Sequence, residues 1–119
     1  MASRTITTKR VYEPPSPQDG TRILVDRVWP RGMSKKDAAI DHWAKDLAPS
    51  TGLRKWFGHD AERWSEFRRR YREELAEKAD EVRAVLEEVG SGPITLVFAA
   101  KNAARNNAVV LKEVLEEGG

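Results

Sequence analysis

Two arginines and a carboxylate stand at the end of an apolar, β-branched segment of the chain, residues 21–28. The cluster comprises Asp26, Arg27, Trp29 and Arg31. The planar guanidinium of arginine binds phosphate and carboxylate groups through paired hydrogen bonds. A tryptophan beside the arginines can stack on a planar ligand or a base. The cluster therefore predicts the binding of an anionic small molecule or nucleotide.

Asp26 is also a candidate catalytic residue, because a carboxylate can act as the acid–base group while neighbouring arginines stabilise charge. If the protein is an enzyme, we expect a hydrolase or transferase acting on a phosphate- or base-containing substrate. His59 is the second catalytic candidate, since histidine titrates near neutral pH. The alternative roles are structural. Asp26 would only pair with Arg27 or Arg31, and His59 would only begin a helix beside Asp60.

A second polar cluster follows another apolar segment, residues 94–100. It comprises Lys101, Asn102, Arg105 and Asn106. In open α/β sheets, ligands bind beyond the C-terminal ends of the strands. If the two apolar segments are neighbouring parallel strands, both clusters lie on one rim, and the final helix points its N-terminus at the same place. We favour a binding role for the combined cluster, since charges that flank buried strands are costly unless they are used.

The composition restricts the classes of protein that are possible. The chain has 119 residues, of which 39% are hydrophobic and 34% are charged, and this predicts a single globular domain over residues 1–119. It contains no cysteine and only two histidines, which excludes thiol chemistry, Cys-based metal sites and His-rich metal cages. We therefore expect no metal and no cofactor. Without an apolar segment long enough to span a membrane, we expect a cytoplasmic protein with no membrane partner.

The charges divide unevenly along the chain. Residues 1–72 hold 16 Lys and Arg against 9 Asp and Glu, whereas residues 73–119 hold 5 against 10. A second hypothesis is therefore a nucleic-acid-associated protein that uses its basic N-terminal portion, with Trp29 or Trp56 stacking on bases. The run of arginines at residues 68–72 supports it weakly, because a helix spreads these side chains around its axis. Neighbouring acids can neutralise them, and these are Glu66, Glu73 and Glu74.

Periodicity and turn signals predict the elements that position these residues. Strands are expected at residues 5–12 and 21–28, joined by a proline-rich loop too short for a crossover helix. The two strands are therefore antiparallel neighbours, or parallel and separated by another strand. Ser34 predicts the start of a helix that places Ala39 or Ile40, Trp43 and Leu47 on one side.

The second half of the chain contains the longest predicted element. Asp60 is the expected N-cap of a helix over residues 61–89, with a bend near residues 76–80. The apolar run at 94–100 predicts a central strand, and Asn102 predicts the N-cap of a last helix over residues 103–117. The order of elements indicates a compact α/β sandwich with a small sheet.

Several segments together resemble a known family. They are KRVYEPP at residues 9–15, LVDRVWPRG at 24–32, WFGHD at 56–60, AAK at 99–101 and NNA at 106–108. These resemble the YeaO-like branch of the family called domain of unknown function (DUF) 488. The resemblance covers nearly the whole chain and implies a small three-layer α/β/α sandwich with a mainly parallel sheet, in a cytoplasmic protein. It implies no established activity.

This sequence departs from the family pattern after the last predicted strand. The relatives typically carry an acidic residue and then a His-Asn pair after the lysine. The corresponding places here hold Asn102, Arg105 and Asn106. If the acid and the histidine do acid–base work in the relatives, this chain lacks it, which favours binding over catalysis. The oligomeric state and the identity of the ligand stay open.

Overall fold

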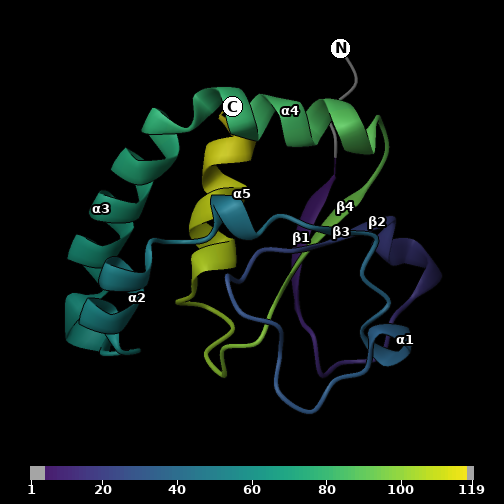
Figure 1. Cartoon of the computed structure of the whole chain (residues 1–119), viewed down its shortest axis with the longest axis horizontal. Helices are drawn as coiled ribbons and strands as arrows, with labels where there is room; N and C mark the ends of the chain where they lie inside the picture. Colours follow the sequence, from purple (N-terminus) through teal and green to yellow (C-terminus); the bar gives the residue numbers. More distant parts are fainter. Residues whose placement is uncertain (1–4, 118–119) are drawn as a thin grey trace.

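Four parallel strands form the sheet of the computed structural model, which describes residues 5–117. Residues 1–4 and 118–119 of the predicted domain lie outside this part. The strands in spatial order are Ile6–Arg10 (β1), Ile94–Phe98 (β4), Thr21–Leu24 (β2) and His42–Trp43 (β3). All neighbours pair in parallel (Figure 1). The predicted α/β class with a mainly parallel sheet is confirmed. β1 and β2, whose relation the sequence left open, are parallel and separated by β4.

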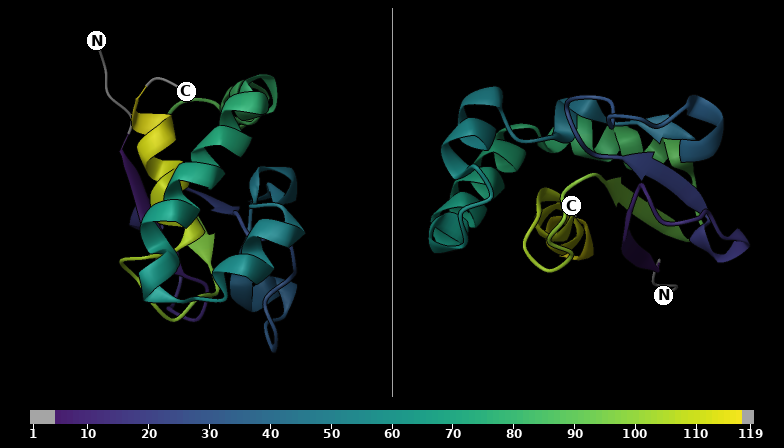
Figure 2. Two further views of the ribbon diagram at one scale, coloured as in Figure 1. Left: turned by 90° about the vertical axis from the view of Figure 1, so that its left-hand side faces the viewer. Right: turned by 90° about the horizontal axis from the view of Figure 1, so that it is seen from below.

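The helices lie mainly on one side of this sheet. They are Lys35–Ala38 (α1), Thr51–Phe57 (α2), Trp64–Glu77 (α3), Ala79–Val89 (α4) and Asn107–Glu116 (α5), with 3₁₀ turns at Pro17–Asp19 (η1), Lys45–Leu47 (η2) and Ala61–Arg63 (η3). α5 lies between α3 and the sheet, and Figure 2 shows the same order from below. Within residues 5–117, no helix is long and apolar enough to cross a membrane.

The larger core lies between the sheet and α3, α4 and α5. Alternate residues of a strand point to opposite faces, and one set from β2 and β4 packs against the helices. The strands contribute Ile6, Ile23, Ile94, Leu96 and Phe98 to this core, Val25 directly follows β2, and the helical side chains include Phe67, Tyr71, Leu75, Val82 and Leu111. Full burial of one such side chain contributes about 1.5–3 kcal/mol. This core fixes α5, and with it the N-terminus of α5, against the sheet.

The opposite face of the sheet is covered by α1 and by the connections that flank β2. Its small apolar cluster comprises Val11, Leu24, Ala38 and Val97. Beside it, Arg22 donates to Asp19 (2.6 Å), and Lys9 donates to the other oxygen of Asp19 (3.1 Å). Burial alone would raise the pKa of Asp19, but the amide of Ser16 and these two cations hold it below its usual range. The ion cluster ties the 11–20 loop to the sheet.

The helix predicted after Ser34 is wrong beyond its first turn. Ser34 caps α1 as expected, but Ala39 takes a left-handed conformation (φ 50°) and ends the helix. The backbone N–H of Asp41 then donates to the carbonyl of Arg22 (2.9 Å), and its carboxylate accepts from the N–H of Arg22 (2.8 Å). These bonds bring the chain to the edge of β2. Trp43, expected on a helix, therefore belongs to strand β3.

The predicted start of the last helix is also wrong. Asn102 does not cap a helix; its side-chain oxygen accepts from the N–H groups of Ala104 (2.9 Å) and Arg105 (3.0 Å) within a turn. The N-cap is Asn106, which accepts from the N–H of Val109 (3.1 Å), so α5 begins four residues later than predicted. The turn at Asn102 competes successfully with helix formation because it satisfies the same donors locally.

The predicted strands are each longer than the observed ones. β1 ends at Arg10, β2 at Leu24 and β4 at Phe98, before the predicted ends at 12, 28 and 100. The N–H of Val25 still donates to Val97 (3.0 Å), and beyond it the chain leaves the sheet. The polar clusters therefore lie in the loops that follow the strands.

The break in the predicted long helix is confirmed. α3 and α4 meet at Lys78, within the expected region of residues 76–80, and α4 turns sharply away from α3 (Figure 1). Asp60 provides the expected N-cap, since its carboxylate accepts from the N–H of Glu62 (2.9 Å) at the start of η3.

The arginines of residues 68–72 are engaged by acidic partners. Arg68 pairs with Glu113, Arg69 with Glu66 and Glu73, Arg70 with Glu66, and Arg72 with Glu117. Hydrogen bonds from Arg69 and Arg70 lower the pKa of Glu66 to about 2. Glu74, expected to take part, instead accepts from the N–H and hydroxyl of Ser50 at the start of α2. Arg68–Glu113 joins α3 to α5 and Arg72–Glu117 joins α3 to the C-cap of α5, so the arginine run helps hold the two helices together.

Candidate functional site

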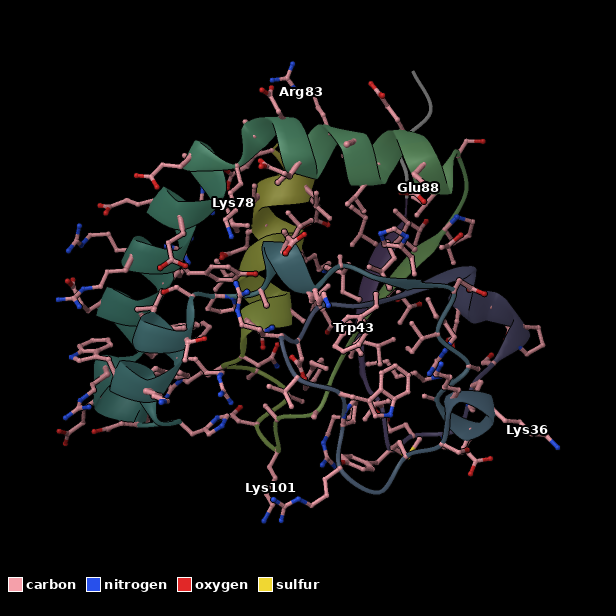
Figure 3. All side chains as sticks on the ribbon, viewed as in Figure 1. Lys36, Trp43, Lys78, Arg83, Glu88 and Lys101 are labelled. Atoms are coloured by element: carbon pink, nitrogen blue, oxygen red, sulfur yellow. The ribbon has the colours of Figure 1, made fainter. Side chains whose placement is uncertain are left out.

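The two polar clusters meet in one cleft because β2 and β4 are parallel neighbours. The cleft, here called the strand-end cleft, has a volume of about 680 Å³. Eight of the nine predicted site residues line it: Asp26, Arg27, Trp29, Arg31, His59, Lys101, Asn102 and Asn106. Arg105 is exposed and does not line it. Figure 3 shows Lys101 at the edge of the molecule opposite Arg83 and Glu88 of α4. The position of the cleft is the one that the parallel arrangement predicts.

Asp26 stands where the ends of β2 and β4 meet the start of α5. Its Oδ2 accepts from the backbone N–H of Ala99 (2.9 Å), and its Oδ1 accepts from the side-chain amide of Asn107 (3.1 Å). Burial raises the pKa of Asp26; these hydrogen bonds and the nearby charges of Arg54 and His59 act in the opposite direction. The alternative role of Asp26, pairing with Arg27 or Arg31, is absent among the ion pairs of residues 5–117. Asp26 therefore links strand ends and helix.

Arg27 is held in place by two backbone carbonyls. Its Nε donates to Pro49 (3.2 Å) and its Nη2 donates to Ala48 (3.2 Å). Among the described residues its Nη1 has no hydrogen-bond partner, and that nitrogen is not sealed from solvent. The side chain is half-buried and lines the cleft. A guanidinium fixed in this way presents its free N–H groups to a ligand without losing further side-chain entropy.

Three further basic side chains surround the mouth of the cleft. Arg31, Arg54 and Lys101 are exposed and are here called the basic rim. Arg54 comes from α2, and the sequence analysis did not identify it because it follows no strand. The lining therefore holds four Lys or Arg side chains, Arg27 included, against one carboxylate, that of Asp26. The charged side chains that line the cleft are therefore mostly positive.

The asparagines at the start of α5 have different roles. Asn106 is buried (1% exposed) and fully engaged, since it caps α5 and donates to the carbonyl of Asn102 (2.8 Å). Asn107 donates to the carbonyl of Val25 (2.8 Å) and to Asp26. Because both partners are acceptors, the NH₂ group must face them, and the Oδ1 of Asn107 has no hydrogen-bond partner within residues 5–117. Asn107 was missed as a site residue, although it belongs to the NNA motif that carried the family resemblance.

Aromatic and apolar side chains form much of the remaining wall. Phe57 and Phe67 are stacked with ring centroids 4.2 Å apart, and both line the cleft. Trp29 is half-buried, donates its indole N–H to the carbonyl of Met33 (2.7 Å) and packs edge-on against Trp43 (5.5 Å). Its ring is thus fixed by protein contacts. The cleft therefore combines a charged mouth with an apolar interior surface.

His59 lies on the wall of the cleft, in a left-handed conformation (φ 61°) directly after the C-cap Gly58 of α2. It is exposed, and within residues 5–117 no hydrogen bond joins it to Asp26. The same part of the chain contains no group of three or more His, Asp or Glu side chains placed to hold a metal ion. The described side chains of the cleft therefore offer positive charge and hydrogen-bonding groups.

These features define a small α/β protein with a basic cleft at the C-terminal ends of parallel strands. A family model described as "Inactive DUF488-N3 subclade" matches residues 5–118. The chain belongs to this DUF488 family, and the YeaO-like resemblance is confirmed. It is 44% identical over 110 residues to the "Uncharacterized protein YeaO" of Escherichia coli (strain K12), covering 92% of this chain and 96% of that protein.

Mycobacterial proteins are similarly related. The "Uncharacterized protein Rv3073c" of Mycobacterium tuberculosis (strain ATCC 25618 / H37Rv) is 44% identical over 112 residues, covering 92% of each chain. The "Uncharacterized protein Mb3100c" of Mycobacterium bovis (strain ATCC BAA-935 / AF2122/97) gives the same values. No solved structure matches the chain significantly. These relatives therefore support the membership of this chain in the family, and their names state no function.

Proposed function

We propose that this protein binds an anionic small molecule or nucleotide in the strand-end cleft. The observation that carries the proposal is the state of Arg27. Two backbone carbonyls fix its guanidinium, and its Nη1 remains free in a cleft whose mouth bears Arg31, Arg54 and Lys101. A guanidinium that is already fixed can bind an anion with little further reorganisation, and the neighbouring positive charges favour that anion.

The size of the cleft supports a metabolite rather than a single inorganic ion. Pockets for small molecules and cofactors measure roughly 300–1,000 Å³, and the cleft, at about 680 Å³, lies within this range. Its apolar wall, with Phe57 and Phe67, suits a ligand that has an uncharged part as well as an anionic group. A cytoplasmic location is part of the proposal, and it rests on the sequence alone.

The proposal concerns binding rather than catalysis. Both oxygens of Asp26 accept hydrogen bonds from groups that the fold itself must satisfy, and His59 is exposed and not bonded to Asp26. The matching family model is described as inactive, which agrees with this choice. The acid and histidine expected after Lys101 in relatives are replaced by Asn102 and Arg105. Hydrolase or transferase activity is therefore the less supported form of the hypothesis.

Thermal-shift measurements with phosphate-containing metabolites and nucleotides test this proposal. We expect at least one of them to raise the melting temperature, and we expect Arg27→Ala to abolish most of that rise and Arg31→Ala to reduce it. Arg83→Ala is the matched control, because Arg83 is an exposed arginine of α4 that lies far from Lys101 (Figure 3). It removes the same charge and should leave the shift unchanged.

Nucleic-acid association is the competing function. It predicts binding to generic DNA or RNA that weakens steeply with salt and is indifferent to Arg27→Ala and Arg31→Ala. The pairing of the arginine run with glutamates argues against that run as the binding surface. Salt-steep nucleic-acid binding that is unchanged in both variants, with no thermal shift by any small anion, would overturn the cleft proposal.

A further inference from the structure

We propose that the ligand of the strand-end cleft is a guanine nucleotide, with its base at Asp26 and Asn107 and its phosphate at the basic rim. This inference rests on the proposed function and names the ligand class of the same site. It follows from the kind of hydrogen-bonding group that each part of the cleft leaves free.

The half-buried side chains of Asp26 and Asn107, here called the inner part of the cleft, offer hydrogen-bond acceptors. Each carboxylate oxygen of Asp26 accepts one hydrogen bond from the protein and has one acceptor position left. Asn107 has committed its NH₂ group to Val25 and Asp26, which leaves its Oδ1 as another acceptor. The ligand atoms that meet this region must therefore be hydrogen-bond donors, and preferably adjacent ones.

The charges fix the orientation of the ligand. The carboxylate of Asp26 repels a phosphate from the inner part, whereas Arg31, Arg54 and Lys101 at the exposed mouth attract it. Arg27, with its free Nη1, adds another anion-binding donor. A ligand with a donor-rich ring at one end and a phosphate at the other matches both regions.

The apolar wall and the acceptors together suit a ring better than a sugar or an alkyl chain, because an alkyl chain offers Asp26 no donor and a sugar leaves hydroxyl groups unpaired. Phe57, Phe67 and Pro49 line the cleft and provide apolar surface, but few polar groups that could satisfy the hydroxyl groups of a sugar. A flat heterocycle covers apolar surface with its face, while its edge carries the donors that Asp26 can accept. The common bases differ at this edge.

Guanine presents two adjacent donors on its Watson–Crick edge, N1–H and the 2-amino group. Adenine presents one amino group beside an acceptor nitrogen, which would face the carboxylate of Asp26 unfavourably. Hypoxanthine keeps N1–H and lacks the 2-amino group. A site built from acceptors discriminates among them, because each buried group left unpaired costs about 1–3 kcal/mol.

Calorimetric titration of the unmodified chain with four ligands tests the inference. The ligands are guanosine, inosine and adenosine 5′-monophosphates and ribose 5-phosphate. We expect guanosine monophosphate to bind about tenfold or more tightly than the inosine nucleotide, and the inosine nucleotide to bind more tightly than the adenosine one. Ribose 5-phosphate should bind most weakly. Because the series uses the unmodified chain, no variant needs to fold for the test to decide.

The outcomes distinguish the guanine assignment from the proposed binding of an anion in the strand-end cleft. Equal affinities for the guanosine nucleotide and ribose 5-phosphate would overturn the guanine assignment and leave anion binding intact. Adenosine monophosphate that binds as tightly as the guanosine nucleotide would overturn it as well. If none of the four ligands binds, both the assignment and the nucleotide form of the proposed function fail.

Discussion

The carboxyl group of Asp26 joins three parts of the fold at the floor of the cleft. It accepts from Ala99 after β4 and from Asn107 at the start of α5, while Asp26 itself follows β2. Its environment combines desolvation, which favours the neutral acid, with hydrogen bonds that favour the anion. For Asp26 burial is the larger effect, so its pKa is raised.

The raised pKa predicts a defined pH dependence of stability. An acid whose pKa is higher in the folded state than in the unfolded state stabilises the fold fully below the unfolded value, and this contribution is lost as the pH rises through the folded value. We therefore expect the free energy of unfolding of the native chain, relative to that of Asp26→Asn, to fall as the pH rises from below 3.8 through the raised pKa.

Carboxyl-carbon NMR titration and urea unfolding across this pH range measure both quantities. The titration midpoint of Asp26 should lie above 3.8. A midpoint at or below that value, or a stability difference between native and Asp26→Asn chains that does not change with pH, would contradict this account of Asp26. Asp37→Asn on α1 is a control, because its carboxylate is exposed.

At the residue scale, the sequence predicted most of the cleft but not all of it. Asp26, Arg27, Arg31 and Lys101 could be found because they directly follow apolar segments whose ends must share one edge of a parallel sheet. Arg54 could not be found in this way, because it reaches the cleft from α2 through tertiary packing. Such a contact depends on how helices pack on the sheet, and local sequence does not encode it.

At the scale of elements, the start of α5 decides which polar groups face the cleft. The sequence analysis expected Asn102 to be the N-cap of the last helix. In the structure Asn106 caps the helix and is buried, whereas Asn102 closes an exposed turn. Four residues that would otherwise extend the helix form a loop beside Lys101.

Paired substitutions test this assignment of the cap. We expect Asn106→Ala to lower the free energy of unfolding by about 1–2 kcal/mol, because it removes the cap and the hydrogen bond to Asn102. Asn102→Ala should cost about 0.5 kcal/mol or less, since its side chain is exposed. Urea unfolding of both variants measures the difference. Equal losses, or a larger loss for Asn102→Ala, would show that α5 begins earlier than described.

Strand β3 shows why one element was missed. Its two residues, His42–Trp43, carry a pattern that also fits the face of a helix, and a short apolar pattern cannot distinguish the two. The bonds that decide the outcome run from Asp41 to Arg22, 19 residues away in the sequence. The break between α3 and α4 was predictable because a helix of about 43 Å exceeds what a domain of this size can accommodate.

At the scale of the whole molecule, the basic first part and the acidic second part of the chain form ion pairs with each other. The acidic second half supplies Glu113 and Glu117 to the arginines of α3, so much of the opposite charge is cancelled inside the fold. The basic residues that remain at the strand-end cleft, Arg27, Arg31 and Arg54, do not take part in the ion pairs of residues 5–117. The molecule is therefore basic where its strands end, which is where we propose that an anion binds.

The most direct test of the central claim is a ¹H–¹⁵N NMR titration with inorganic pyrophosphate, which probes the anion site without assuming a base. We expect saturable shifts of the backbone amides of Lys101 and Asn107 and of the Arg27 side-chain N–H, with α4 around Arg83 unchanged. Shifts confined to α4 or to the arginines of α3, with those of Arg27 and Lys101 unmoved, would contradict the claim that the strand-end cleft binds anions.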